Sequence, residues 1–211
     1  MAKLNRVGKW AMNSPQRAFA QRYYVAPLIE RLGGRVDAGP VLEVGCGRGV
    51  GAEIIVNRFG ASRVCALDFD AEMVDRAQRR LGRLDGLIVR VEQGDAACLR
   101  FPDESFEAVF DFGAIHEIAN WQAALSEVRR VLKPGGRFFF EEIAWRPLRW
   151  LMRFTVEEYE SLEANPFTPE KFLTEIERQG FEVSESHVTR RLLSLTGVIG
   201  DLIGVARKKE E

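Results

Sequence analysis

The chain has few of the residues that build metal centres and disulfide frameworks. Its 211 residues include three cysteines and two histidines. Cys46, Cys65 and Cys98 show no C-x-x-C spacing, and His116 and His187 lie far apart in the sequence. The sequence therefore predicts neither a disulfide nor a metal site.

The sequence also lacks a long apolar run and a strong charge of one sign. Lys3, Arg6 and Lys9 near the N-terminus are not followed by the continuous apolar core of a signal peptide or a membrane span. The formal net charge of −1 gives no long-range attraction to nucleic acid. We therefore expect a cytoplasmic protein without a nucleic-acid partner.

No internal repeat, low-complexity tract or shift in composition divides the chain. Apolar residues make up 46% of it and charged residues 29%, which is ordinary for a globular protein with a sizeable core. A length of 211 residues is long for one domain and short for two. We expect a single domain over residues 1–211, in which a helical extension at 1–38 precedes the first strand.

What the sequence does contain is a glycine-rich turn around which the rest of the chain is organised. The apolar run 41–44 leads into Gly45, Gly47 and Gly49, and a helical segment follows. Because glycine has no Cβ, the backbone there can turn at positive φ and let a ligand lie against the main chain. The order of strand, tight turn and helix start predicts a site for a nucleotide-like ligand.

The glycine spacing differs from the dinucleotide fingerprint G-x-G-x-x-G, because the third glycine comes one residue early and Val50 holds its expected place. The segment resembles motif I of the class I S-adenosylmethionine (SAM) dependent methyltransferases. In that motif an acidic residue of the strand, here Glu43, precedes a G-x-G-x-G turn. The run 130–136 is similar to the family's helix-to-strand signature. This resemblance implies SAM as the cofactor.

Acidic residues also follow the next two predicted strands. Asp68 ends the buried-type run that begins at Arg63, and an acid there can accept hydrogen bonds from both ribose hydroxyls of a nucleoside. The turn at 94–96 resembles the family's next motif, which implies contacts of Asp95 and Ala96 with adenine. The cofactor-binding residues predicted in this way are Glu43, Gly45, Cys46, Gly47, Gly49, Asp68, Phe69, Gly94, Asp95, Ala96, Asp111 and Phe112.

Many small-molecule members of this family carry a histidine pair in the loop after the fourth strand, and here His116 is followed by Glu117. Histidine is the side chain best suited to take a proton near neutral pH. We expect His116 to be catalytic, with Tyr24 on the covering helix as a weaker candidate that orients it or the acceptor. The alternative that His116 only packs within its loop stays open, because some acceptors need no base.

The segment 144–166 breaks the alternation of strands and helices, and its aromatics and arginines recur at three- and four-residue steps. It is interpreted either as a lid over an apolar substrate or as an amphipathic helix that packs on the domain; membrane contact is not favoured. The connector expected at 189–193, after a sixth strand at 181–188, would start at the same edge. The residues expected near the acceptor are Glu117, Trp145, Leu151, Arg190 and Arg191.

Strands that alternate with capped helices specify an α/β fold, a parallel sheet with helices on both faces. The family resemblance implies a Rossmann-like, seven-stranded, mostly parallel sheet of order 3-2-1-4-5-7-6 with an antiparallel last strand. The expected N-cap residues of its helices are Ser14, Asp70, Asn120 and Thr168.

The resemblance implies methyl transfer from SAM to a small acceptor that is apolar or amphipathic. Two alternatives stay open at this point. The protein could bind SAM as a sensor or accessory protein without transferring the methyl group, since the strong motifs concern the cofactor. It could also be a nicotinamide-dependent oxidoreductase. The sequence does not set the oligomeric state.

Overall fold

The computed structural model describes residues 9–10, 12–36, 39–84, 88–143, 168–194 and 197–210. The expected lid at 144–166, with Trp145 and Leu151, lies outside the described residues. Within the described ranges, no helix is long and apolar enough to cross a membrane.

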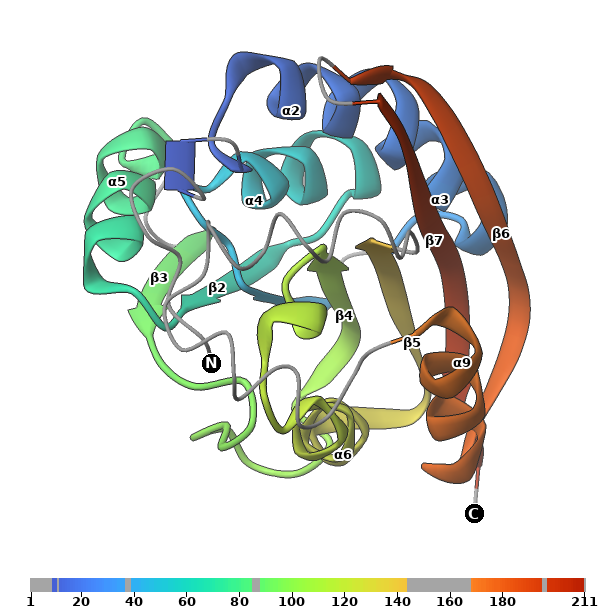
Figure 1. The fold of residues 1–211 in the computed structure, drawn as a ribbon. Coiled ribbons are helices and arrows are strands. Elements are labelled where there is room, and N and C mark those ends of the chain that lie inside the picture. The colour runs from blue at the N-terminus through green and yellow to red at the C-terminus, as the bar shows by residue number, and fades with distance from the viewer. Residues whose placement is uncertain are drawn as a thin grey trace.

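One seven-stranded sheet, of order β3-β2-β1-β4-β5-β7-β6, runs through the molecule (Figure 1). Neighbouring strands from β3 to β5 are parallel, and β7 is antiparallel to both β5 and β6. The predicted strand order is confirmed, including the antiparallel last strand. The strands are β1 (Pro40–Val44), β2 (Arg63–Asp68), β3 (Val89–Gln93), β4 (Phe106–Phe112), β5 (Leu132–Ile143), β6 (Phe181–Ser194) and β7 (Gly197–Lys208).

Helices cover both faces of this sheet. The first layer holds α3, α4 and α5, and the second layer holds α6 and α9. All four expected N-cap side chains accept a hydrogen bond from the first turn of their helix. The helical elements are α2 (Pro15–Ala20), η1 (Gln21–Val25), α3 (Ala26–Gly33), α4 (Val50–Ile54), η2 (Ile55–Phe59), α5 (Ala71–Leu81), η3 (Ile115–Glu117), α6 (Trp121–Val131) and α9 (Pro169–Arg178).

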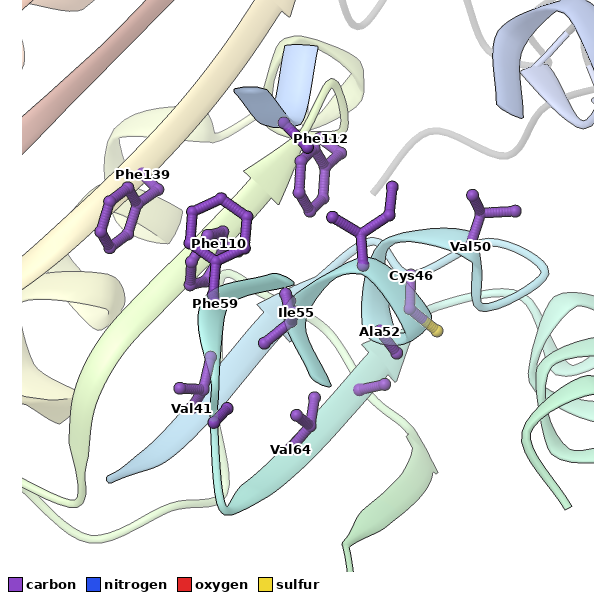
Figure 2. Packing of buried hydrophobic residues seen from close by; sticks show 14 of the residues in the cluster. Val41, Cys46, Val50, Ala52, Ile55, Phe59, Val64, Phe110, Phe112 and Phe139 are labelled. Atoms are coloured by element: carbon purple, nitrogen blue, oxygen red, sulfur yellow. The ribbon is translucent and has the colours of Figure 1, made fainter. Parts of the chain in front are cut away.

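The buried residues of the central strands alternate between the two layers. On β4, Phe110 belongs to the first layer and Val109 to the second, as the period of a strand requires. Figure 2 shows Phe59, Phe110 and Phe139 grouped together, and the stacked rings of Phe110 and Phe139 have centroids 4.4 Å apart. Phe112 continues this group, so the core extends to the carboxyl edge of the sheet.

The sequence predicts that Pro27 interrupts the N-terminal helix, and this prediction is wrong. α2, η1 and α3 follow one another without a break, with Pro27 in the first turn of α3. The intervening η1 is a π-helix, in which the N–H of Ala26 bonds to the carbonyl of Gln21. This wider turn lets the chain continue past a residue that has no N–H to donate.

Three strand boundaries also differ from expectation. β5 begins at Leu132 and not at Gly136, because Gly135 at φ 71° allows a bulge between two stretches paired with β4. β6 runs on to Ser194 and β7 begins at Gly197, so the connector expected at 189–193 is wrong. Beyond the pairing of Ile143 with Asp201, β6 and β7 pair with each other, and among the described residues they form a two-stranded extension.

The aromatic group of the first layer makes a testable contribution to stability. We expect Phe110→Ala to lower the free energy of unfolding by about 3 to 5 kcal/mol, because it removes a fully buried ring and leaves a cavity. Urea unfolding measures this loss. The matched control is Phe19→Ala, whose ring is 66% exposed and whose loss should stay within about 0.5 kcal/mol. Equal losses in both variants would contradict the assignment of the core.

Candidate functional site

The glycine turn lies at the carboxyl end of β1. Gly45, Gly47 and Gly49 have φ values of 67°, 52° and 83°, so the predicted positive φ is confirmed at all three. A Cβ on Gly45 would lie 2.1 Å from the Cβ of Ala114, which leaves no room for a side chain there. A Cβ on Gly49 would lie 2.8 Å from Leu81 Cδ1. Gly49 therefore lets α4 pack on α5, while the first part of the turn faces the site.

Asp68, at the end of β2, holds this turn in place. Its Oδ2 accepts a hydrogen bond of 2.8 Å from the N–H of Gly47, and its Oδ1 accepts one of 2.9 Å from the N–H of Asp70. Burial raises the pKa of Asp68, and these two hydrogen bonds counteract that shift. Phe69 beside it is 38% exposed. The structure thus brings Asp68 and the glycine turn together.

Glu43 is buried under the start of α4, and its Oε2 has no hydrogen-bond partner among the described residues. Burial and the nearby Asp68 raise the pKa of Glu43 well above its usual range. A Cβ on Gly51 would lie only 1.9 Å from Glu43 Oε1. Gly51 is therefore a site residue that the sequence analysis missed, although a fourth glycine inside a helix, where glycine is unfavourable, was a signal. Burial also raises the pKa of the Cys46 thiol, so this cysteine acts as a small buried residue.

A cavity lies between the glycine turn, the end of β4 and the N-terminal segment, here defined as the described residues 9–10 and 12–21. Its volume is about 90 Å³. The predicted residues that line it are Glu43, Gly45, Cys46, Gly47, Asp68, Phe69, Phe112 and Glu117. The lining residues that were not predicted are Lys9, Met12, Asn13, Arg17, Ala18, Gln21, Arg48, Val50, Gly51, Asp70, Met73, Gly113 and Ala114.

The N-terminal segment is held across the cavity by polar contacts. Lys9 Nζ lies 2.5 Å from Asp70 Oδ2 and 2.8 Å from Glu72 Oε2. Arg48 of the glycine turn donates a hydrogen bond of 3.2 Å to the carbonyl of Ser14. These partners are more than 30 residues apart, and no local pattern in the sequence indicates them.

Arg17 connects the same segment to the end of β5. Its guanidinium donates two hydrogen bonds, of 2.7 and 2.8 Å, to the carboxylate of Glu141. A third, of 3.0 Å, goes to the carbonyl of Phe112. A two-fold bond between a guanidinium and a carboxylate fixes both partners, so α2 is held over the carboxyl ends of β4 and β5.

His116 is buried next to a carboxyl group of β5. Its Nδ1 lies 2.5 Å from Glu142 Oε2, and its backbone N–H donates a hydrogen bond of 3.2 Å to Glu142 Oε1. Burial lowers the pKa of His116 and raises that of the fully buried Glu142 to about 8. One carboxyl group thus fixes both the ring and the backbone of the predicted catalytic residue.

Asp111 and Glu117 complete this acidic cluster. Burial and the adjacent Glu142 raise the pKa of Asp111 well above its usual range, and its Oδ1 accepts a 2.8 Å bond from the N–H of Ala114. Glu117 Oε1 lies 3.9 Å from His116 Nε2, and burial raises the pKa of Glu117 to about 7. Of these acidic residues and His116, only Glu117 belongs to the cavity lining.

Other predicted residues lie outside the cavity lining. The N–H of Gly94 bonds to the carbonyl of Asp68, Asp95 Oδ1 accepts a bond from the N–H of Ala97, and Ala96 is buried in the core. Tyr24, in η1, is 44% exposed. The backbone of Arg190 and Arg191 lies in the two-stranded extension of β6 and β7. The expected roles of these residues stay predictions.

The part of the chain that the structure describes contains no group of three or more His, Cys, Asp or Glu side chains that could hold a metal ion. The features of the cavity suit a nucleoside cofactor better. The main chain that lines it turns at glycines, the carboxylate of Asp68 is fixed by an amide, and one buried carboxyl oxygen of Glu43 has no partner in the part of the chain that the structure describes.

The fold and the site together define a Rossmann-like protein of the methyltransferase type, and comparison with known proteins agrees. Residues 41–136 match the family model described as a methyltransferase domain. The chain is 36% identical, over 125 residues, to the fatty-acid O-methyltransferase of Mycolicibacterium smegmatis, covering 59% of this chain and 42% of that protein. It is 32% identical, over 158 residues, to the demethylmenaquinone methyltransferase of Tropheryma whipplei, covering 71% and 64%.

Among solved structures, phosphoethanolamine N-methyltransferase 2 of Haemonchus contortus in complex with SAM matches with a TM-score of 0.71 at 16% identity, over 96% of this chain and 59% of that one. This likeness concerns the fold. The chain thus carries, at residues 41–136, a methyltransferase domain similar to those of the class I SAM-dependent methyltransferases, whose cofactor is SAM. It spans about half the length of the curated relatives it matches.

The buried acids predict how stability depends on pH. The folded pKa values of Glu117 and Glu142, about 7 and about 8, lie above the ordinary value of 4.5, so folding favours their protonated forms. This stabilisation is complete below pH 4.5 and is lost as the pH rises through 7 to 8. The lowered pKa of His116 affects the free energy of unfolding only below about pH 6.5.

We therefore expect the free energy of unfolding to fall by roughly 2 to 3 kcal/mol between pH 6.5 and 8.5. Urea unfolding at both pH values measures this change. Glu142→Gln should remove the larger part of the fall, whereas Glu182→Gln, at an exposed position of β6, should leave it unchanged. A wild-type stability that is flat or rises over this range would contradict the assignment.

Proposed function

We propose that the protein transfers a methyl group from SAM to a small apolar or amphipathic acceptor. One observation carries this proposal. The glycine turn, Asp68 and the buried Glu43 meet at a single cavity on the carboxyl edge of the sheet, which is where such sheets bind ligands. The family of the chain supports SAM over a nicotinamide cofactor.

The residues of the cavity suit the parts of SAM. A carboxylate has about four acceptor sites, and Asp68 uses two of them for the N–H groups of Gly47 and Asp70. The remaining sites are suited to the ribose hydroxyls. Oε2 of Glu43 would accept a hydrogen bond from the amino group of the methionine part. Phe69, at 38% exposure, would lie against the adenine.

Bound SAM supplies an electrophilic methyl group on a positively charged sulfur. The protein's main task is to align the acceptor with that group, and alignment alone contributes up to roughly 7 to 11 kcal/mol in favourable cases. Phe112 and the N-terminal segment, which both line the cavity, would hold SAM and the acceptor in place.

The acceptor class is proposed from the cavity and the relatives. Met12, Met73 and Phe112 give the cavity an apolar wall. The names of two relatives refer to a fatty acid and to demethylmenaquinone, which are both lipid-like molecules. The segment 144–166 as a lid and the arginines at 190 and 191 remain part of this proposal. A SAM-binding protein without transfer is the alternative that must be tested.

Incubation with SAM labelled in its methyl group decides between transfer and binding alone. The acceptors are palmitate and 4-nonylphenol, and extraction into an organic phase separates labelled product from SAM. We expect label in at least one product. If calorimetry shows SAM binding and no label reaches either acceptor or a metabolite extract, the transferase proposal is wrong and the sensor alternative holds.

The site assignment predicts that Asp68→Ala weakens SAM binding. The lost carboxylate made charge-assisted hydrogen bonds, so the loss should be about 1.5 to 3 kcal/mol, or roughly 10- to 150-fold in the dissociation constant. Calorimetry measures the constant. The matched control is Asp75→Ala, an exposed position of α5, which should bind SAM like the wild type. Equal affinities of all three proteins would remove Asp68 from the site.

A further inference from the structure

The loop after β4 offers two groups for proton transfer, and they differ in what they face. The side chain of Glu117 lines the cavity and is 10% exposed. The side chain of His116 is 5% exposed and does not belong to the lining. Since a general base must reach the proton that it takes, Glu117 is the better placed of the two.

Glu117, His116 and Glu142 follow one another at short distances. Glu117 Oε1 is 3.9 Å from His116 Nε2, and His116 Nδ1 is 2.5 Å from Glu142 Oε2. Asp111 interacts with Glu142 and with His116. Glu142 has no exposed surface, and its two oxygens fix the backbone and the ring of His116. His116 is thus held with Nε2 on the side of Glu117.

The charges around Glu117 come from several elements. Arg17 of α2 is the cation, and it is paired with Glu141 of β5. The other charged or titratable neighbours are Asp68 of β2, Asp111 of β4, Glu142 of β5 and His116 of η3. Burial and these acids keep the pKa of Glu117 near 7, where a carboxyl group both accepts and releases a proton readily.

We propose that Glu117 is the general base that takes the proton of the acceptor, and that His116, seated on Glu142, is the positioning residue behind it. The proposal rests on the methyl transfer proposed above. In the step, the acceptor oxygen forms a bond to the methyl carbon and the carbon–sulfur bond breaks with its electron pair left on sulfur, giving S-adenosylhomocysteine. The proton of the acceptor O–H passes to the carboxylate of Glu117.

This role for Glu117 specifies the acceptor class more narrowly. A base is useful to a hydroxyl or phenol, which must lose a proton as it is methylated. A fatty-acid carboxylate has already lost its proton at neutral pH and needs no base. The acceptor that fits this site is therefore an amphipathic molecule with a hydroxyl group.

The kinetic test compares two acceptors, 4-nonylphenol and palmitate, in the wild type and in Glu117→Gln. For 4-nonylphenol, we expect turnover to fall by about 100-fold or more. For any turnover of palmitate, the change should stay within a few-fold, and calorimetry should give SAM affinities within a few-fold. Glu182→Gln is the matched control and should behave like the wild type. A few-fold change for 4-nonylphenol in Glu117→Gln would overturn the proposal.

The positioning role of His116 and Glu142 has its own readout. In the wild type, kcat/KM for 4-nonylphenol should rise with pH through a value near 7. Glu142→Gln should shift the pH at which kcat/KM rises, because it removes the carboxyl group that holds His116 next to Glu117. The SAM affinity should stay unchanged. Loss of turnover in His116→Ala together with full turnover in Glu117→Gln would make His116 the base instead.

A spectroscopic test does not depend on turnover. Infrared difference spectra between pH 6 and pH 8.5 should contain the carbonyl band of a protonated carboxyl group that disappears in Glu117→Gln. A Glu117 band that does not titrate in this range overturns the proposal even where no acceptor is methylated. If the band titrates and neither acceptor is methylated, the proposed acceptors are wrong while the assignment of a proton-exchanging Glu117 is supported.

Discussion

The hydrogen bonds that Asp68 accepts from Gly47 and Asp70 are the constraint on which the site depends. The bond from Gly47 joins the carboxyl ends of β1 and β2 and holds the glycine turn, while the bond from Asp70 fixes the carboxylate within its own loop. That turn determines where α4 begins, where Glu43 is buried and where the N-terminal segment lies. One carboxylate with amide donors from two loops thus sets the geometry of a cavity built from residues far apart in the chain.

Burial of several acids at one edge of the sheet is costly, because a carboxylate without water needs a partner of opposite charge or a proton. Glu141 has a cation, Arg17, in a two-fold bond. Glu117 and Glu142 instead keep their protons near neutral pH. Burying these acids lowers the stability of the protein, but it gives the edge of the sheet groups that exchange protons near neutral pH. Such groups are common at functional sites.

Much of the fold could be predicted from the sequence because its signals are local. Caps, glycine stops and the alternation of strands and helices lie within a few residues of the elements that they define. Asp68 was also found, since it ends a strand next to the glycine turn. The contacts of Glu142 with His116 and of Lys9 with Asp70 join residues 26 and more than 60 positions apart, and no local pattern predicts them. Pro27 was misjudged because a π-helical turn can absorb its missing N–H.

The contact between Gly51 and Glu43 has a consequence for how this protein can change over generations. The carboxyl group of Glu43 occupies the place where any side chain at position 51 would begin. A larger residue at 51 is therefore acceptable only after position 43 has become shorter, and a long acid at 43 is acceptable only while 51 stays glycine. Related sequences should therefore carry a residue larger than glycine at 51 only where position 43 has a shorter side chain.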